Sequence, residues 1–177
     1  MIKIHDKTFQ LYISESEIQA AVKQLAKKID ADLRNQNPLF IAILNGAFVF
    51  AADLMRAISF DAPINFIKTQ SYVGTTSSGT VQTVLGLNES IEGRTVVIVE
   101  DIVDTGHTLK RLLQILTEKG ADSIKIAAFL QKPEALQHPD LIADYVGIEI
   151  PDKFVVGYGL DYDGLGRGLA DIYQLQE

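Results

Sequence analysis

A concentration of carboxylates lies near the middle of this 177-residue chain, where residues 97–109 read Val-Ile-Val-Glu-Asp-Ile-Val-Asp-Thr-Gly-His-Thr-Leu. Glu100, Asp101 and Asp104 fall within five positions, and carboxylates so close together raise one another's energy unless a cation or a hydroxyl group is present. Glu100 and Asp101 can accept hydrogen bonds from the vicinal hydroxyls of a ribose and help to bind Mg²⁺. The structural alternative is that Asp104 caps a helix and the other two are solvated acids of a turn.

The residues that follow these acids have the composition of a phosphate-binding turn. Thr105, Gly106 and Thr108 would supply backbone N–H groups and hydroxyls at the beginning of a helix, where the helix dipole favours an anion. Gly106 has no side chain, so the backbone can approach the ligand closely. A phosphate site beside acceptors for a diol and a divalent cation indicates a phosphorylated ribose as the ligand.

The segments around this cluster alternate between helical and extended patterns. A capping box at Ser14 and Glu17 begins an amphipathic helix whose apolar stripe continues to Leu33. Further helices are expected at residues 47–58 and 105–119, and strands at 39–44, 64–68, 95–99, 123–130, 145–149 and 154–158. This alternation predicts an α/β fold with a parallel sheet covered by helices on both faces.

Ligands of such sheets bind at the carboxyl ends of the strands. The segments that follow Leu44, Val99, Leu130 and Tyr158 are therefore the places to look for site residues. Residues 71–79 are small, polar and rich in glycine, which is typical of an exposed loop.

The composition limits the classes of function. The chain has 47% hydrophobic and 22% charged residues, which is ordinary for a globular domain, and no cysteine, which excludes disulfides, thiolate metal sites and a cysteine nucleophile. No apolar run reaches the roughly 18 residues of a transmembrane helix. The net charge of −7 disfavours nucleic acid as a partner. We therefore expect a cytoplasmic protein that binds neither nucleic acid nor membrane and that holds anions through local devices.

Residues 100–108 resemble the phosphoribosyl-pyrophosphate signature of the type I phosphoribosyltransferases, and in particular of their hypoxanthine-guanine branch. Residues 44–47 and 150–162 are similar to further segments of that family, in the family's order, so the resemblance covers almost the whole chain. It implies the type I phosphoribosyltransferase fold in a single domain of residues 1–177, with a central mostly parallel sheet flanked by helices and a mobile loop. The N-terminal segment and residues from about 131 to 177 would form a small hood.

The resemblance also assigns ligands to individual residues. The phosphoribosyl group would lie against Glu100, Asp101, Thr105, Gly106, His107 and Thr108. Pyrophosphate would bind to Asn45, Gly46 and Arg167, and Mg²⁺ would lie near Glu100, Asp101 and Asp161. Two positions depart from the family's pattern, because Asn45 stands where many relatives have lysine and His107 where lysine or arginine is common.

A second group of residues would act on the purine. By resemblance, Lys132 donates to the purine O6, Phe154 stacks on the base and Val155 meets its edge through backbone groups. Ser71 and Tyr72 begin the loop that would close over the substrates and exclude water.

The expected reaction is the Mg²⁺-dependent transfer of a 5-phosphoribosyl group from phosphoribosyl pyrophosphate to hypoxanthine or guanine, as in purine salvage. Asp104 would accept the proton that the attacking purine nitrogen loses. By resemblance the enzyme is a homodimer or a homotetramer.

Three alternatives remain open at this point. The enzyme could prefer xanthine or adenine, because the pattern of residues does not fix the exocyclic groups of the base. A regulatory RNA-binding protein on the same fold would need a basic face, which the net charge disfavours. A nucleotide-binding module without catalysis would leave Asp104 and the loop at residues 71–79 without a role.

Overall fold

A six-stranded sheet forms the centre of the molecule. The computed structural model describes residues 1–70, 82–85, 90–138 and 140–176. The strands are β3 (Leu39–Leu44), β4 (Ile64–Gln70), β5 (Gln82–Leu85), β6 (Thr95–Val103), β7 (Ser123–Gln131) and β8 (Tyr145–Glu149). Their order is β5-β4-β3-β6-β7-β8, in which β5 is antiparallel to β4 and all other neighbours are parallel. The expected mostly parallel sheet is confirmed.

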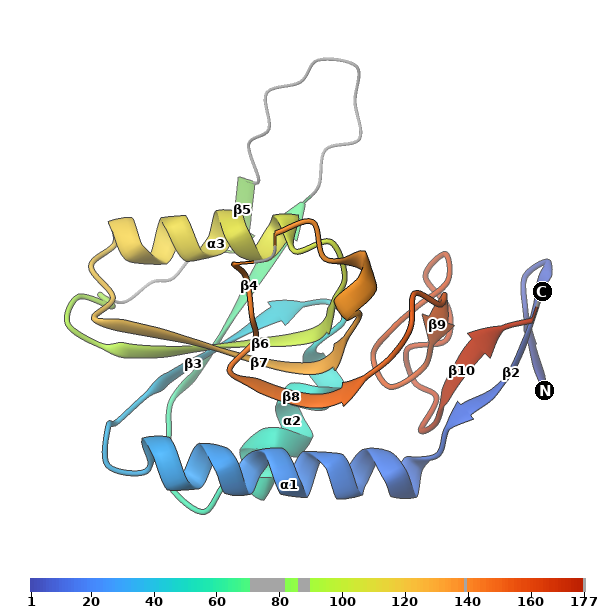
Figure 1. Cartoon of the computed structure of the whole chain (residues 1–177), viewed down its shortest axis with the longest axis horizontal. Coiled ribbons are helices and arrows are strands. Elements are labelled where there is room, and N and C mark those ends of the chain that lie inside the picture. Colours follow the sequence, from blue (N-terminus) through green and yellow to red (C-terminus); the bar gives the residue numbers. More distant parts are fainter. Residues whose placement is uncertain (71–81, 86–89, 139, 177) are drawn as a thin grey trace.

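Helices cover both faces of this sheet (Figure 1). Helices α1 (Glu15–Leu33) and α2 (Phe48–Ala57) pack on one face, and α3 (His107–Glu118) packs on the other. The predicted capping box begins α1, since the Ser14 side chain accepts from the Glu17 N–H and the Glu17 carboxylate accepts from the Ser14 N–H. The two faces bury separate apolar cores, one around Phe50 and Phe129 and the other around Leu112 and Leu116.

A second, smaller sheet lies beside the carboxyl ends of the main strands (Figure 1). It consists of β1 (Ile2–Ile4), β2 (Lys7–Ile13), β10 (Ile172–Leu175) and β9 (Val155–Val156), in that order, and its own core contains Phe9 and Val156. This sheet joins the two ends of the chain, which is where the hood was expected. None of the helices in the described part of the chain is long and apolar enough to cross a membrane.

Three predicted boundaries are wrong, each for a physical reason. Strand β6 continues to Val103 instead of ending at Val99, because its backbone stays paired with β7 through the acidic residues. Helix α3 begins at His107 after Gly106, whose φ of 83° is not helical. The strand expected at 154–158 is only β9, because the backbone at residues 157–159 has positive φ throughout. β9 also belongs to the smaller sheet, so Tyr158 does not end a strand of the main one.

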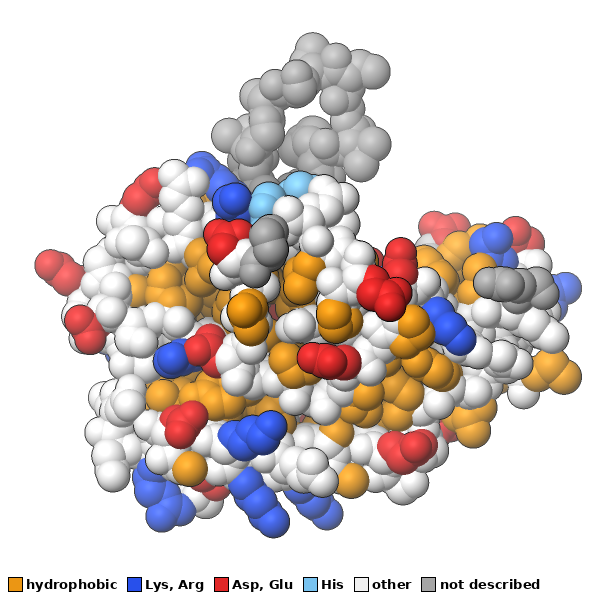
Figure 2. Space-filling view, viewed as in Figure 1, with side chains coloured by type: hydrophobic (Ala, Val, Ile, Leu, Met, Phe, Trp, Pro, Cys, Tyr) orange, Lys and Arg blue, Asp and Glu red, His pale blue; other side chains and the backbone are white. Residues whose placement is uncertain are grey.

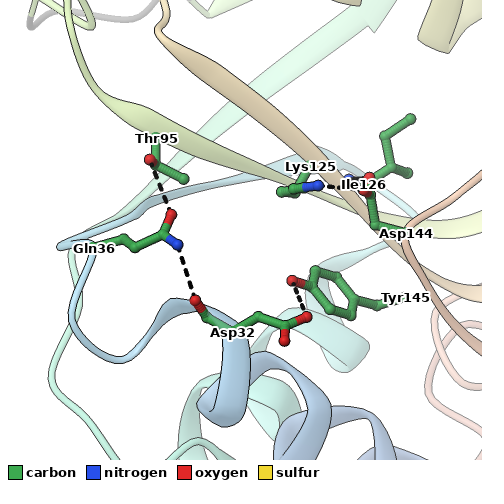
Figure 3. A network of polar contacts seen from close by, with 7 residues as sticks. All are labelled: Asp32, Gln36, Thr95, Lys125, Ile126, Asp144 and Tyr145. Atoms are coloured by element: carbon green, nitrogen blue, oxygen red, sulfur yellow. Dashed lines mark hydrogen bonds and ion pairs between the residues drawn. The ribbon is translucent and has the colours of Figure 1, made fainter.

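Polar contacts at the amino-terminal edge of the main sheet join β8 to α1 and β7 to the residue before β8 (Figure 3). The Tyr145 hydroxyl donates to Asp32 at 3.1 Å, and the Asp144 carboxylate accepts from the Ile126 N–H at 2.9 Å and from Lys125 at 2.8 Å. A 3₁₀ turn (Pro133–Ala135) follows β7 at the opposite edge. The structural polar network thus lies at one edge of the sheet and the predicted site residues at the other.

Candidate functional site

The loop between β3 and α2 is enclosed by two other segments of the site. The peptide bond between Leu44 and Asn45 is cis. A Cβ added to Gly46 would lie 1.6 Å from Oδ2 of Asp101, at the end of β6. A Cβ added to Gly159 would lie 2.0 Å from the carbonyl oxygen of Gly46. Three segments that are far apart in the sequence therefore meet at one place with no room for a methyl group.

The two acids near the end of β6 lie in a poorly solvated environment. Burial raises the pKa of Glu100 well above its ordinary value, and the neighbouring Asp101 carboxylate adds to the effect. Burial also raises the pKa of Asp101 to about 6, although the Ile102 N–H donates to its Oδ1 at 2.9 Å and Arg167 lies near enough to oppose the shift. Oε2 of Glu100 is buried and has no hydrogen-bond partner among the described residues. Such an oxygen requires a cation or a hydroxyl donor from a ligand.

The start of α3 forms a small hollow. It has a volume of about 90 Å³ and is lined by Glu100 and residues 102–109. That is about three times the roughly 30 Å³ of one water molecule in the liquid, so the hollow can hold a small anion. Gly106 precedes α3 without a side-chain cap, and the first N–H groups of the helix have no carbonyl partner within it. The alternative interpretation of Asp104 as the cap of this helix is therefore wrong, because Gly106 occupies the N-cap position.

Asp104 instead forms an ion pair with Lys132, which follows β7. The Lys132 ammonium donates to Oδ2 of Asp104 and to Oδ1 of Asp152, both at 3.0 Å, and its side chain is only 8% exposed. Burial lowers the pKa of Lys132, but the two carboxylates outweigh this effect and leave the pKa raised. Lys132 is therefore a charged donor held at a fixed place.

Arg167 is held by contacts within the loop that follows β9. Its guanidinium donates to the carbonyl oxygen of Gly159 and pairs with Oδ1 of Asp161, both at 2.7 Å. The other oxygen of Asp161 accepts from the Gly164 N–H at 2.8 Å. No three His, Cys, Asp or Glu side chains among the described residues are grouped so as to hold a metal ion by themselves.

Comparison with known proteins agrees with this geometry. The sequence profile of the phosphoribosyl transferase domain matches residues 14–163. The chain belongs to the phosphoribosyltransferase family. It is 40% identical to a hypoxanthine-guanine phosphoribosyltransferase of Aquifex aeolicus over the full length of both chains, and 44% identical to that of Bacillus subtilis over 92% of this chain and 91% of the relative.

Solved structures of this branch have the same fold. A hypoxanthine-guanine phosphoribosyltransferase of Bacillus anthracis superimposes with a TM-score of 0.88 at 38% identity, covering 97% of this chain and 99% of the other. The hypoxanthine phosphoribosyltransferase of Trypanosoma cruzi, in complex with the product IMP, superimposes with a TM-score of 0.87 at 39% identity, covering 99% and 98%. The type I phosphoribosyltransferase fold is thus confirmed.

In this phosphoribosyltransferase, Phe154 and Val155, which were expected at the purine, follow Asp152 in the sequence and lead into β9. Phe154 is 47% exposed and its ring meets Tyr162 edge-on at a centroid distance of 5.8 Å, while Val155 is buried in β9. Phe154 follows two residues after Asp152, the partner of Lys132. Ser71 and Tyr72 lie outside the described residues.

A larger cavity, of about 890 Å³, lies between α1, α2 and residues 167–170. Of the predicted site residues, only Arg167 lines it. Its size alone does not make it the site of a phosphoribosyltransferase, because the buried carboxylates and the hollow at α3 lie elsewhere.

Three features of the site were missed in the sequence. Asp152 is the second partner of Lys132, and His138 contacts His107, but neither belongs to a pattern of spacing that would reveal it. Tyr158 donates to Asp53 of α2 at 2.8 Å and so ties the loop that carries Arg167 to this helix. Only the glycines on either side of Tyr158 signalled unusual backbone there.

We predict that Gly159→Ala lowers the free energy of unfolding by about 1–3 kcal/mol or more, because the φ of 100° strains any other residue and the new Cβ meets the Gly46 carbonyl. Urea unfolding followed by circular dichroism measures the change. Gly168→Ala is the matched control, since nothing lies within 4 Å of its added Cβ. Equal stability of the two variants would contradict the close contact.

Proposed function

We propose that this enzyme transfers the 5-phosphoribosyl group of phosphoribosyl pyrophosphate to hypoxanthine or guanine, which gives IMP or GMP and pyrophosphate. The observation that carries the proposal is the meeting of three groups at one edge of the sheet. These are the hollow at α3, the partly buried acids near the end of β6 and the charged Lys132 after β7. The hollow would take a phosphate, the acids would take the ribose diol, and Lys132 would take the purine carbonyl. In keeping with the sequence, we further propose a cytoplasmic enzyme that acts as a homodimer or homotetramer.

The residues present fit a divalent cation that is completed by the substrate. Magnesium in proteins is usually bound by one or two carboxylates together with substrate phosphates and water. Glu100 and Asp101 would provide these carboxylates, and the unpartnered Oε2 of Glu100 is an open ligand position. Asp161 would take part only through its pairing with Arg167, because both of its oxygens already have partners. The cation would supply positive charge that stabilises the departing pyrophosphate.

The chain's own groups orient the reaction. The N–H groups of residues 105–108 would bind the 5′-phosphate, and Arg167 with the amides around Gly46 would bind pyrophosphate. In the transfer, the bond from ribose C1 to pyrophosphate breaks and the bond from C1 to the purine nitrogen forms. The proton of that nitrogen goes to Asp104, whose Oδ1 has no partner among the described residues, while Oδ2 remains with Lys132.

Lys132 would recognise the oxygen at purine C6. An ammonium group has three N–H donors, and Asp104 and Asp152 use two of them. The third donor is left for an acceptor on the ligand. A 6-oxopurine offers this acceptor, whereas the amino group of adenine does not.

The direct test of the proposed function is an assay of pyrophosphate release with Mg²⁺, phosphoribosyl pyrophosphate and each purine in turn. Release with hypoxanthine or guanine supports the proposal. Release with xanthine or adenine alone would favour the corresponding alternative, and no release with any base would contradict the activity.

We predict that Asp104→Asn lowers kcat at least tenfold, because proton transfer by a placed side chain usually contributes about 10²–10⁴-fold. IMP binding, measured by calorimetry, should persist. Asp152→Asn is the matched control, since it removes the other carboxylate partner of Lys132 and leaves the proton acceptor in place. If both variants lose activity equally, the ion pair matters and Asp104 is not the acceptor.

We also predict that hypoxanthine is used at least tenfold faster than adenine, because an unmade hydrogen bond to a charged donor costs about 1–3 kcal/mol. Lys132→Gln should reduce this ratio towards one, since an amide can donate or accept. A competition assay with both bases, resolved by chromatography, measures the ratio. Lys125→Gln removes a lysine that also pairs with an aspartate, at the other edge of the sheet, and should leave the ratio unchanged. An unchanged ratio in Lys132→Gln would contradict the role of Lys132.

A further inference from the structure

A row of hydrogen-bonded side chains lies beside the hollow at α3. Lys110 Nζ is 3.3 Å from Nδ1 of His138, Nε2 of His138 is 2.8 Å from Nδ1 of His107, and Nε2 of His107 is 2.9 Å from Oε1 of Gln137. The two imidazole rings meet edge to face at a centroid distance of 4.8 Å. Histidine side chains lie together on the surface near the start of α3 (Figure 2).

The lysine sets the direction of all three hydrogen bonds. An ammonium group can only donate, so Nδ1 of His138 accepts. His138 then carries its proton on Nε2 and donates to His107, which carries its proton on Nε2 and donates to the oxygen of Gln137. Both histidines are therefore neutral in this arrangement, and each ring nitrogen has one partner.

The row reaches the hollow through His107, which lines it. Cδ2 of His138 lies 3.7 Å from the position of a Cβ added to Gly106, which also lines the hollow. The Gln137 N–H donates to the carbonyl oxygen of Thr105 at 3.2 Å, which holds the segment that carries His138 against the phosphate-binding turn. An anion in the hollow would consequently lie against His107, whose ring is hydrogen-bonded to that of His138.

Few other charges act on the histidines. Lys110 of α3 is the charged side chain in direct contact with them. Asp104 is paired with Lys132, and the exposed Glu134 and Asp140 form no ion pair with the described residues. Before an anion binds, both Lys110 and the positive end of the α3 dipole oppose a further positive charge on the pair.

A bound phosphate dianion would instead favour a positive charge on the histidine pair. Both nitrogens that could take a proton, Nδ1 of His138 and Nδ1 of His107, are acceptors in the row. A proton on Nδ1 of His138 breaks the contact with Lys110 directly. A proton on Nδ1 of His107 requires Nε2 of His138 to become an acceptor, which moves the His138 proton to Nδ1 and breaks the same contact. Movement of Lys110 towards an anion would leave Nδ1 of His138 free to bind a proton from the solvent.

We propose that Lys110, His138 and His107 form a proton-coupled source of positive charge for the phosphate site. Phosphate binding draws Lys110 to the anion, and the histidine pair takes up a proton. The inference rests on the proposed function, since it takes the hollow as the site of the 5′-phosphate. It also supplies charge at the position where a fixed lysine or arginine is absent.

The number of protons taken up on binding tests this inference. IMP is titrated into the protein by calorimetry at pH 7 in two buffers with different ionisation enthalpies, and affinities are compared at pH 6 and pH 8. Proton uptake in the native protein should exceed that in His138→Gln by a fraction of a proton, up to about one, because histidine titrates between about pH 5 and 8. The affinity of the native protein should rise about threefold more than that of the variant on going from pH 8 to pH 6.

The variants separate the possible outcomes. His138→Gln removes the nitrogen that Lys110 would leave, while its amide N–H still donates to Nδ1 of His107 and keeps that nitrogen occupied. Binding of IMP by this variant at pH 8, where little proton uptake is expected, shows that it is folded. His5→Gln changes the third histidine, which is bonded to the Asp163 carbonyl, and should behave as the native protein. The proton balance of the IMP phosphate is common to all three and cancels in the differences. Equal proton uptake in native protein and His138→Gln would overturn the inference alone, whereas absence of IMP binding would overturn the proposed function with it.

Discussion

The close packing of Gly46 between the Asp101 carboxylate and the backbone of Gly159 is the constraint on which the site depends. It fixes the loop between β3 and α2, the acidic end of β6 and the loop that carries Arg167 relative to one another, although these segments come from distant parts of the chain. A methyl group on either glycine would have to displace backbone or a buried carboxylate. The same packing buries Asp101 and raises its pKa, so that the geometry of the loop and the electrostatics of the acids have one cause.

The proposed site would let a chain of net charge −7 bind the 5′-phosphate and the pyrophosphate of its substrate through a few groups held in defined positions. Each cation at the site is held by carboxylates of the protein, Lys132 by Asp104 and Asp152 and Arg167 by Asp161. In the proposed site, backbone N–H groups at α3 and the histidine row would supply the rest of the attraction for phosphate. Ion pairs of this kind hold each donor in a fixed direction and give little general attraction for polyanions. This agrees with a small-molecule substrate.

Much of the fold could be predicted from the sequence, because the apolar runs and helix caps are local signals. The capping box at Ser14 and the turn at Gly106 are examples. The end of β6 was misplaced because acidic residues resemble a turn, whereas pairing of Glu100 with Ala128 and of Val103 with Gln131 in β7 keeps the strand extended. The contacts of Lys132 and His138 could not be predicted from the sequence, because they depend on how the loops after β7 and β8 pack on the start of α3. The resemblance indicated Lys132 and Asp104 as site residues, but their direct ion pair depends on the tertiary structure.

The most direct test of the account is a crystal structure of the protein with IMP. We predict that the 5′-phosphate lies against the backbone N–H groups of residues 105–108, with the ribose hydroxyls towards Glu100 and Asp101 and the purine oxygen at Lys132. A nucleotide bound instead in the cavity of about 890 Å³ between α1 and α2, with the hollow at α3 empty, would contradict the assignment of the site.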